Sequence, residues 1–407
     1  MGLVTRASLT EIATFGRASA AWDTNAAGAL QQFPADAIRG TPGAGYLIEG
    51  GVTNTVRDPR LELLRVAGTA PALSAGAAVH PHWSTFSPNG ITSEIVGRGV
   101  LNGLSYVDVR MTGTSTNSYY VTAVDNSAQS AVVGDTFTAS AYVAHVGGSM
   151  ANITNVSIQA RLNGSATSTV MELTNSLQRF SRTNTETVAG AACYPAFGLS
   201  FPTGAEIDIT LRIAGCQFAK QPFLTSLILP PAGNPAPSVR TADNLAISGA
   251  PFAAIFGAGA PQGCLVMDIQ LDTIAATPNG RYFAQLDDGT AMNRVQFRTD
   301  TSGVSLATQR TVAGAGNRGI ATINAVTAGA PLRAGIRWIA ATGATSLCIN
   351  GGALGSVVDD FPAGLNTLRL GSSHAVGDQI NGRIRLARAC AFAPSDAEFR
   401  AMCVMGA

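Results

Sequence analysis

Apolar and polar residues alternate along several short runs of the chain, which is the period of a half-buried β-strand. Such runs lie at 106–111, 137–143, 156–162 and 207–213. The third run leads into Asn163-Gly164, a strong signal for a tight hairpin turn. Because no long helical period accompanies these strands, the pattern predicts a jelly-roll β-sandwich in this part of the chain.

The last third of the chain shows further strand-like runs, at 265–270, 294–298, 332–338 and 346–350. Trp338 lies in an apolar alternating run, so we expect it in a core rather than at a binding surface. One helix is predicted, at 394–399, where Ser395 and Glu398 have the spacing of a capping box. The predicted fold class is therefore all-β, with a second antiparallel sandwich after the jelly roll.

The composition suits two or three domains with sizeable cores, since 46% of the 407 residues are apolar and 13% are charged. A net charge of +1 predicts no electrostatic capture of nucleic acid or of acidic membranes. No run of about 18 apolar residues occurs, so no membrane insertion is predicted. The first residues also lack the features of a signal peptide, and the protein is expected to be made in the host bacterial cytoplasm.

The cysteines and histidines do not form a metal-binding pattern. The six cysteines are widely spaced, without a C-x-x-C pair, and most lie in apolar strand-like runs. We expect them to be reduced and buried. His80 and His82 have the i, i+2 spacing of two ligands on one strand face, but an incidental pair beside Pro81 is the favoured interpretation. No metal site or cofactor is predicted.

The acidic residues do not form a recognisable active site. Asp287-Asp288 and Asp359-Asp360 are adjacent pairs, whose side chains point to opposite faces of a strand, whereas a glycosidase needs facing carboxylates. The run 286–290 is interpreted as a turn, with Ca²⁺ ligation as the alternative. The chain also lacks a G-x-S-x-G nucleophile motif. We therefore predict no enzymatic activity.

Aromatic side chains are the candidates for stacking on sugar rings, although they make up only 6% of the chain. The candidate glycan-binding residues are Trp83, Tyr106, Tyr119 and Tyr120. Adjacent residues of a strand face opposite ways, so one of Tyr119 and Tyr120 should lie outside. For Trp83, packing in the core or at an edge is an equal alternative to a stacking role.

Three segments resemble parts of bacteriophage fibre and spike proteins, in the same order. The opening segment is similar in Thr5-Arg6-Ala7-Ser8, Arg39, 45–49 and Thr53-Asn54. Residues 89–162, with 146–152, resemble a carbohydrate-binding jelly roll of these proteins. The junction is similar in Gln217, Thr225, Ser226, Ile228, Pro230, Arg240, Ala242 and Asp243. Finally, 332–338, 350–352, 368–372 and 379–384 resemble a concanavalin A-like (laminin-G-like) sandwich.

The resemblance implies three parts: an attachment or collar segment at 1–60, a carbohydrate-binding jelly roll at 61–236 and a concanavalin A-like domain at 237–407. It implies a fibre or spike on the surface of a phage or of a gene-transfer particle, on its head or its tail. Its partners would be other virion proteins, through the first segment, and host surface polysaccharide. A homotrimer is expected, because several weak sites then act together. The alternatives are a capsule-degrading hydrolase or lyase and a purely structural decoration protein.

Overall fold

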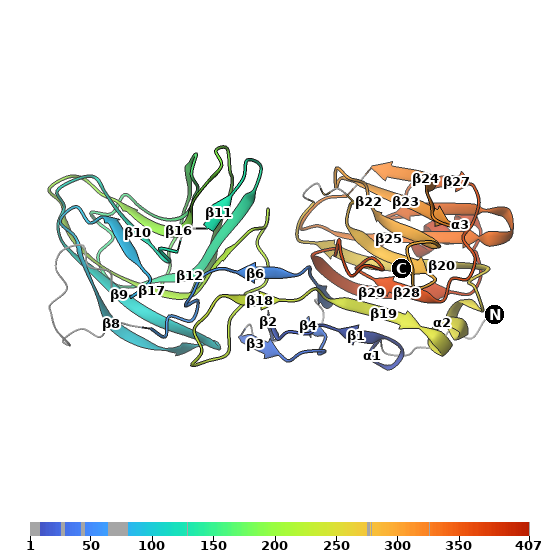
Figure 1. Cartoon of the computed structure of the whole chain (residues 1–407), viewed down its shortest axis with the longest axis horizontal. Coiled ribbons are helices and arrows are strands. Elements are labelled where there is room, and N and C mark those ends of the chain that lie inside the picture. Colours follow the sequence, from blue (N-terminus) through green and yellow to red (C-terminus); the bar gives the residue numbers. More distant parts are fainter. Residues whose placement is uncertain are drawn as a thin grey trace. The chain divides into compact units, whose positions relative to one another are not determined.

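The chain is all-β, as predicted, and divides into two compact units (Figure 1). The computed structural model describes residues 9–25, 29–41, 45–63, 80–127, 129–274, 277, 279–324 and 326–406. We call Ala21–Gln32 with Val52–Arg240 the first sandwich. The described parts of Met1–Ala20, Phe33–Gly51 and Thr241–Ala407 form the second sandwich. The quoted run Thr5-Arg6-Ala7-Ser8 lies outside the described residues.

Two antiparallel sheets face each other in the first sandwich. The β13 sheet has the order β14 (Ala166–Val170), β13 (Asn155–Arg161), β16 (Gly190–Ser200), β10 (Tyr119–Ala123), β7 (Ser84–Ser87), with β11 (Gln129–Ala131) also paired to β16. The β9 sheet has the order β15 (Gln178–Thr185), β12 (Thr136–Gly148), β17 (Glu206–Ala219), β9 (Leu104–Thr114), β8 (Thr92–Leu101).

The alternation of the sequence decides which side chains lie between these sheets. Val107, Val109 and Met111 of β9 are buried in the common core, as are Val156 and Ile158 of β13. The Asn163-Gly164 turn is confirmed, because β13 and β14 pair as a hairpin around it. The polar residues of the same strands lie on the outer faces of the two sheets.

The second sandwich also has two facing sheets. One has the order β1 (Thr14–Gly16), β19 (Asn244–Ser248), β28 (Thr367–Leu370), β21 (Tyr282–Asp287), β22 (Arg294–Thr299), β23 (Ser305–Val312), β24 (Ala315–Asn324). The other has the order β27 (Gly355–Val358), β26 (Ala344–Ile349), β25 (Pro331–Ile339), β20 (Gln262–Leu271), β29 (Gly382–Cys390), β5 (Gly45–Ile48), β4 (Arg39–Thr41). Their apolar faces share one core, in which Trp338 is 1% exposed, as predicted.

The structure corrects the expected separate segment at 1–60. Strand β1 pairs with β19 and strand β5 pairs with β29, so both extend sheets of the second sandwich. Strand β6 (Val52–Asn54) pairs with β18 (Ser238–Arg240) in the first sandwich. Strands β2 (Ala21–Thr24) and β3 (Leu30–Phe33) form a two-stranded hairpin, whose Trp22 packs in an apolar cluster of the first sandwich. Short isolated strands cannot satisfy their backbone groups, which explains why β1 and β5 extend larger sheets while β6 and β2 pair with single partners. The division between the units falls at Arg240/Thr241 rather than after residue 236.

A buried charge network joins motif residues that are far apart in the sequence. The Arg39 guanidinium donates to Glu49 Oε2 at 2.6 Å and to Asp243 Oδ2 at 2.5 Å. The Arg17 guanidinium donates to Asp243 Oδ1 at 3.1 Å. All four side chains are at most 3% exposed, and their formal charges cancel. The opening segment and the junction therefore meet inside the second sandwich.

The remaining junction residues organise the first sandwich. Gln217 donates to Thr225 Oγ1 at 2.9 Å and accepts from the Ile228 amide at 3.0 Å. Asn54 donates to the carbonyls of Cys216 and Ile228 at 3.0 and 2.9 Å. These motif residues are therefore structural rather than part of a binding surface.

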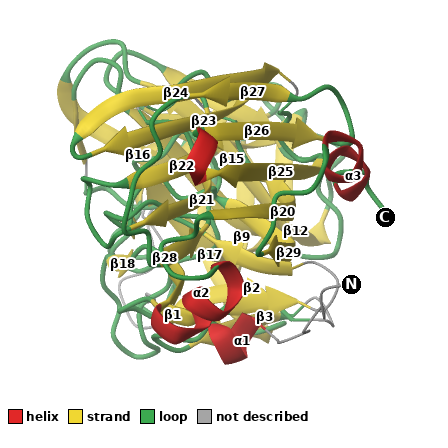
Figure 2. Cartoon of the chain, turned by 90° about the vertical axis from the view of Figure 1, so that its right-hand side faces the viewer, coloured by secondary structure: helices red, strands yellow, loops and turns green. Residues whose placement is uncertain are grey.

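The helices are α1 (Leu9–Ile12), α2 (Gly249–Phe256), the 3₁₀ turn η1 (Ala340–Thr342) and α3 (Asp396–Met402), drawn red in Figure 2. The capping box of α3 is confirmed by the bonds between Ser395 and Glu398. Helix α2 was not predicted, because its sequence GAPFAAIF is almost uniformly apolar and lacks a helical period. None of the helices in the described ranges is long and apolar enough to cross a bilayer.

Candidate functional site

Two of the four predicted glycan-binding residues are buried in the core of the first sandwich. Trp83 is 5% exposed and Tyr120 is 2% exposed, and both belong to the apolar cluster between the sheets. Neither ring presents a face to a ligand, so both assignments are corrected. Tyr120 is inside because it alternates with Tyr119, which is 44% exposed on the outer face of the β13 sheet.

Tyr106 lies on the outer face of the β9 sheet, half-buried. The Arg212 guanidinium sits 3.8 Å from the centre of its ring, and Asp108 holds that guanidinium at 2.8 Å. Gly99, its cross-strand neighbour, leaves room for the phenol, since a Cβ there would lie 2.7 Å from Tyr106 Oη. One face of the ring is therefore already occupied by a cation.

Two aromatic rings meet on the outer face of the β13 sheet. Phe86 of β7 and Tyr194 of β16 have ring centroids 5.2 Å apart, inclined by 39°. Phe86 is 51% exposed and Tyr194 is half-buried. Neither ring is part of the sandwich core, so burial of apolar area in that core does not explain their positions.

A row of polar side chains continues from these rings along β13. Arg161 Nε donates to Tyr194 Oη at 3.2 Å, and Arg161 Nη1 donates to Gln159 Oε1 at 2.9 Å. Gln159 Nε2 in turn donates to Ser157 Oγ at 3.4 Å. These residues are two apart, so they share the outer face while Val156, Ile158 and Ala160 fill the core. We call Phe86, Tyr194, Arg161, Gln159 and Ser157 the aromatic face.

Gly198 of β16 allows this arrangement. A Cβ at this position would lie 2.3 Å from Gln159 Nε2 and 3.0 Å from Ser157 Oγ. A larger residue would therefore displace the Gln159 amide from its place across the strand. The glycine keeps the polar row flat beside the two rings.

The aromatic face combines the chemistry that sugar binding needs. Phe86 offers an apolar ring face to the C–H groups of a pyranose, and the Arg161 guanidinium lies 5.9 Å from the centre of the Tyr194 ring. This guanidinium and the Gln159 amide offer donors and an acceptor to hydroxyl groups. No three metal-ligating side chains converge anywhere in the described part of the chain. The four candidates chosen from the sequence did not include Phe86, Tyr194, Arg161 or Gln159. The alternation at 156–162 already placed the last two on one outer face, whereas nothing local marked Phe86.

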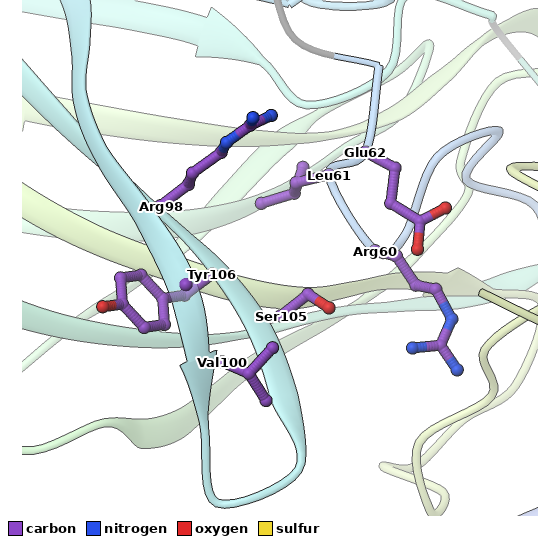
Figure 3. A pocket seen from close by; sticks show the side chains of 8 residues that line it. Arg60, Leu61, Glu62, Arg98, Val100, Ser105 and Tyr106 are labelled. Carbon is purple, nitrogen blue, oxygen red and sulfur yellow. The ribbon is translucent and has the colours of Figure 1, made fainter. Parts of the chain in front are cut away.

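The first sandwich also contains a hollow of about 410 Å³ beside the β8–β9 hairpin. Its lining consists of Arg60, Leu61, Glu62, Arg98, Gly99, Val100, Ser105 and Tyr106. Figure 3 shows the side chains of Arg60 and Arg98 pointing in different directions. Arg60 is already engaged, because its Nε donates to the Pro230 carbonyl at 2.6 Å and its guanidinium lies over Trp22. The polar groups of the hollow do not converge on one ligand, so we do not place the site there.

The interpretation of 286–290 as a turn agrees with its hydrogen bonds. Asp288 Oδ1 accepts from the Thr290 amide and hydroxyl, at 2.9 and 2.6 Å, and Oδ2 accepts from Asn293 at 2.9 Å. Asp287 accepts from the Gly289 amide and pairs with Arg369 at 2.9 Å. His80 is likewise structural, since its Nδ1 accepts from the His82 amide and its Nε2 lies 2.9 Å from Asp58.

No protein-family model matches the chain, and no curated protein matches it. Among solved structures, the CBM40 of Ruminococcus gnavus IT-sialidase bound to alpha2,3 sialyllactose matches 36% of this chain and 83% of its own, at 16% identity and a TM-score of 0.30. A heptameric SAP-like pentraxin from Limulus polyphemus matches 37% of this chain and 72% of its own, at 12% identity and a TM-score of 0.29. A CBM4 structure matches 34% of this chain and 86% of its own, at 16% identity and a TM-score of 0.22. These similarities are too distant to bear on function.

Proposed function

We propose that the first sandwich binds glycan through the aromatic face. The observation that carries this proposal is the pair of rings at Phe86 and Tyr194, placed at the end of the Arg161–Gln159–Ser157 row on an outer sheet face. A planar cation and a planar amide beside one exposed and one half-buried ring suit a sugar, whose ring has apolar faces and polar edges. Tyr119 of β10 lies on the same outer face of the β13 sheet.

We propose further that the chain is a fibre or spike protein of a phage or phage-like particle, which adsorbs to bacterial surface polysaccharide. The support for this role is the order of the three resembling segments along the sequence. Attachment to other virion proteins through the first residues, assembly as a homotrimer and a place on the particle surface belong to the same proposal.

We propose binding without cleavage. Two acids on the outer face of the β9 sheet are paired with arginines: Asp208 accepts from Arg110 at 2.9 and 3.0 Å, and Asp108 accepts from Arg212 at 2.8 and 2.9 Å. The hydrogen bond from Arg110 lowers the pKa of Asp208. A glycosidase needs one carboxyl group that stays protonated to act as an acid, and this environment favours the ionised form.

The test is a glycan array with the purified full-length chain, followed by titration of the best ligand. Replacing one ring, by Phe86→Ala or Tyr194→Ala, should weaken binding about tenfold, and replacing both should weaken it further. Phe392→Ala is the matched control, because Phe392 is 53% exposed in the second sandwich and should not matter. Unchanged affinity in the double variant would place the site elsewhere.

Release of reducing ends is measured in parallel on the same polysaccharides. The expected result is binding with no shortening of the glycan. Shortening by the wild-type chain would favour the capsule-degrading alternative, and no binding to any glycan would favour a structural decoration protein.

A further inference from the structure

In the second sandwich, helix α3 covers a small apolar cluster on the outer face of the sheet that contains β26, β25, β20 and β29. This cluster is separate from the core between the two sheets. The cluster contains Cys264, Val266, Cys348, Phe399 and Cys403, all at most 1% exposed, with Cys390 partly buried at its rim. Gly335 of β25 makes room for it, since a Cβ there would lie 2.7 Å from Cys403 Sγ and 2.9 Å from the Phe399 ring. Four of the six cysteines therefore gather under one short helix.

These four cysteines form two pairs. Cys264 of β20 is the direct cross-strand partner of Cys390 of β29. Cys403, which follows the last residue of α3, lies beside Cys348 of β26 in the same cluster. Within the described residues no three such side chains are placed to hold a metal ion, so the pairs are not a metal centre.

The geometry of the first pair suits a disulfide. Directly opposed residues of antiparallel strands have Cα atoms about 4.5–5.5 Å apart, and disulfides join Cα atoms about 4.4–6.8 Å apart. The two side chains also point to the same face of the sheet. Cys264 belongs to the cluster under α3 and Cys390 packs against this cluster, whereas Leu265 and Met267 of β20 face the sandwich core. The register therefore gives the pair the typical Cα spacing of a disulfide.

The two pairs differ in how an oxidant can reach them. Cys390 is the last residue of β29 and is only half-buried. The Cys264 thiol opposite it lowers the pKa of Cys390, which favours the reactive thiolate. Cys348 and Cys403 are both fully buried beneath Phe399 and α3. An oxidant can therefore attack the first pair in the folded protein, but the second only after α3 leaves the sheet.

We propose that Cys264 and Cys390 are a redox modification site, which forms an intramolecular disulfide between β20 and β29 in oxidising surroundings. The Cys390 thiolate attacks a low-molecular-weight disulfide and releases one thiol, giving a mixed disulfide. Cys264 then attacks the Cys390 sulfur, loses its proton and releases the second thiol. The protein gives up two electrons and two protons, and the oxidant is reduced to two thiols. The link ties two central strands of the second sandwich together and stabilises its folded state.

The test uses the full chain, purified with a reductant, desalted and exposed to oxidised glutathione. Free thiols are then alkylated in denaturant, and the unreduced protein is cut with trypsin for mass spectrometry. We expect one cross-link, between the peptides 241–281 and 389–400 that contain Cys264 and Cys390, while the other four of the six cysteines are alkylated. The temperature of unfolding should rise after oxidation.

Two variants separate the steps. Cys264→Ser should stop at the mixed disulfide, so that Cys390 carries glutathione, whereas Cys390→Ser should react with no glutathione at all and show no change in unfolding temperature. Cys348→Ser, which removes one member of the buried pair, should still form the cross-link. Alkylation of all six cysteines in the oxidised wild type, or a cross-link that involves Cys348 or Cys403 instead, would overturn the proposal.

Discussion

Single ionised residues stabilise local structure within each sandwich. The Arg39–Glu49–Asp243 network of the second sandwich is the clearest case. Asp243 accepts from Arg39, Arg17 and the Glu49 amide, at 2.5, 3.1 and 2.8 Å, in a fully buried position. A buried charge is costly once its partner is removed, because water cannot replace the lost interaction. The network therefore makes the N-terminal strands dependent on the junction.

Asp243→Asn should lower the free energy of unfolding of the second sandwich by about 3–5 kcal/mol, because two buried guanidinium groups would then face one carboxylate instead of two. Urea denaturation followed by circular dichroism measures this. Asp208→Asn is the control: it breaks an ion pair whose members are 43% and 51% exposed, and it should cost less than about 1 kcal/mol. Equal costs for the two variants would contradict the assigned role of the network.

Glu186 organises a turn of the first sandwich in a comparable way. Its carboxylate accepts from the amides of Asn163, Gly164, Thr187 and Val188, at 2.8–3.0 Å. Burial alone would raise its pKa, but the hydrogen bonds from these amides outweigh burial and lower the pKa to about 2 from an ordinary value of 4.5. The ionised side chain therefore stabilises the folded state above pH 4.5, and this contribution is lost as the pH falls towards 2.

Glu186→Gln should accordingly unfold at a lower temperature than the wild type at pH 7, and the difference should shrink between pH 4.5 and 2. Thermal unfolding of both proteins across pH 2–7 measures this. A difference that is constant over the whole range would show that charge is not what Glu186 contributes.

At the scale of elements, α3 is held by its cap and by the surface beneath it. The capping box starts the helix, Phe399 fills the cluster, and Arg337 donates to the Pro394 carbonyl and pairs with Asp396. The helix has only seven residues and needs these tertiary contacts, since so short a helix is unstable alone.

Gly335→Ala should displace α3, because the added methyl group would overlap the Phe399 ring and Cys403 Sγ. Faster hydrogen exchange at 396–402 measures this. Gly16→Ala, also in a strand but with nothing within 4 Å of the new Cβ, should leave exchange unchanged. Protection of α3 in the first variant equal to that in the wild type would count against close packing at Gly335.

At the scale of the whole molecule, the proposed single weak glycan site per chain would make several copies advantageous. We predict a homotrimer of the full-length chain at micromolar concentration and near-physiological salt. Light scattering gives the mass, which should be three times that of the 41.6 kDa chain. A monodisperse monomer would contradict this prediction and weaken the proposed role in adsorption.

The sequence by itself determined what depends on neighbours along the chain. Alternation gave the strands and their inner faces, Asn163-Gly164 gave a hairpin, Ser395 and Glu398 gave the start of α3, and Trp338 was assigned to a core. Each follows from backbone geometry or from a period that a few adjacent residues set.

The tertiary structure alone decided which distant residues meet. Arg39 and Asp243 are 204 residues apart, so no local pattern showed that the opening segment is divided between the two sandwiches. Trp83 and Tyr120 are buried while Phe86 and Tyr194 share an outer face, because strand order and register decide which ring the opposite sheet covers. The same register sets Cys264 beside Cys390. Pairing across a sheet depends on the whole fold, and the sequence of one strand does not contain it.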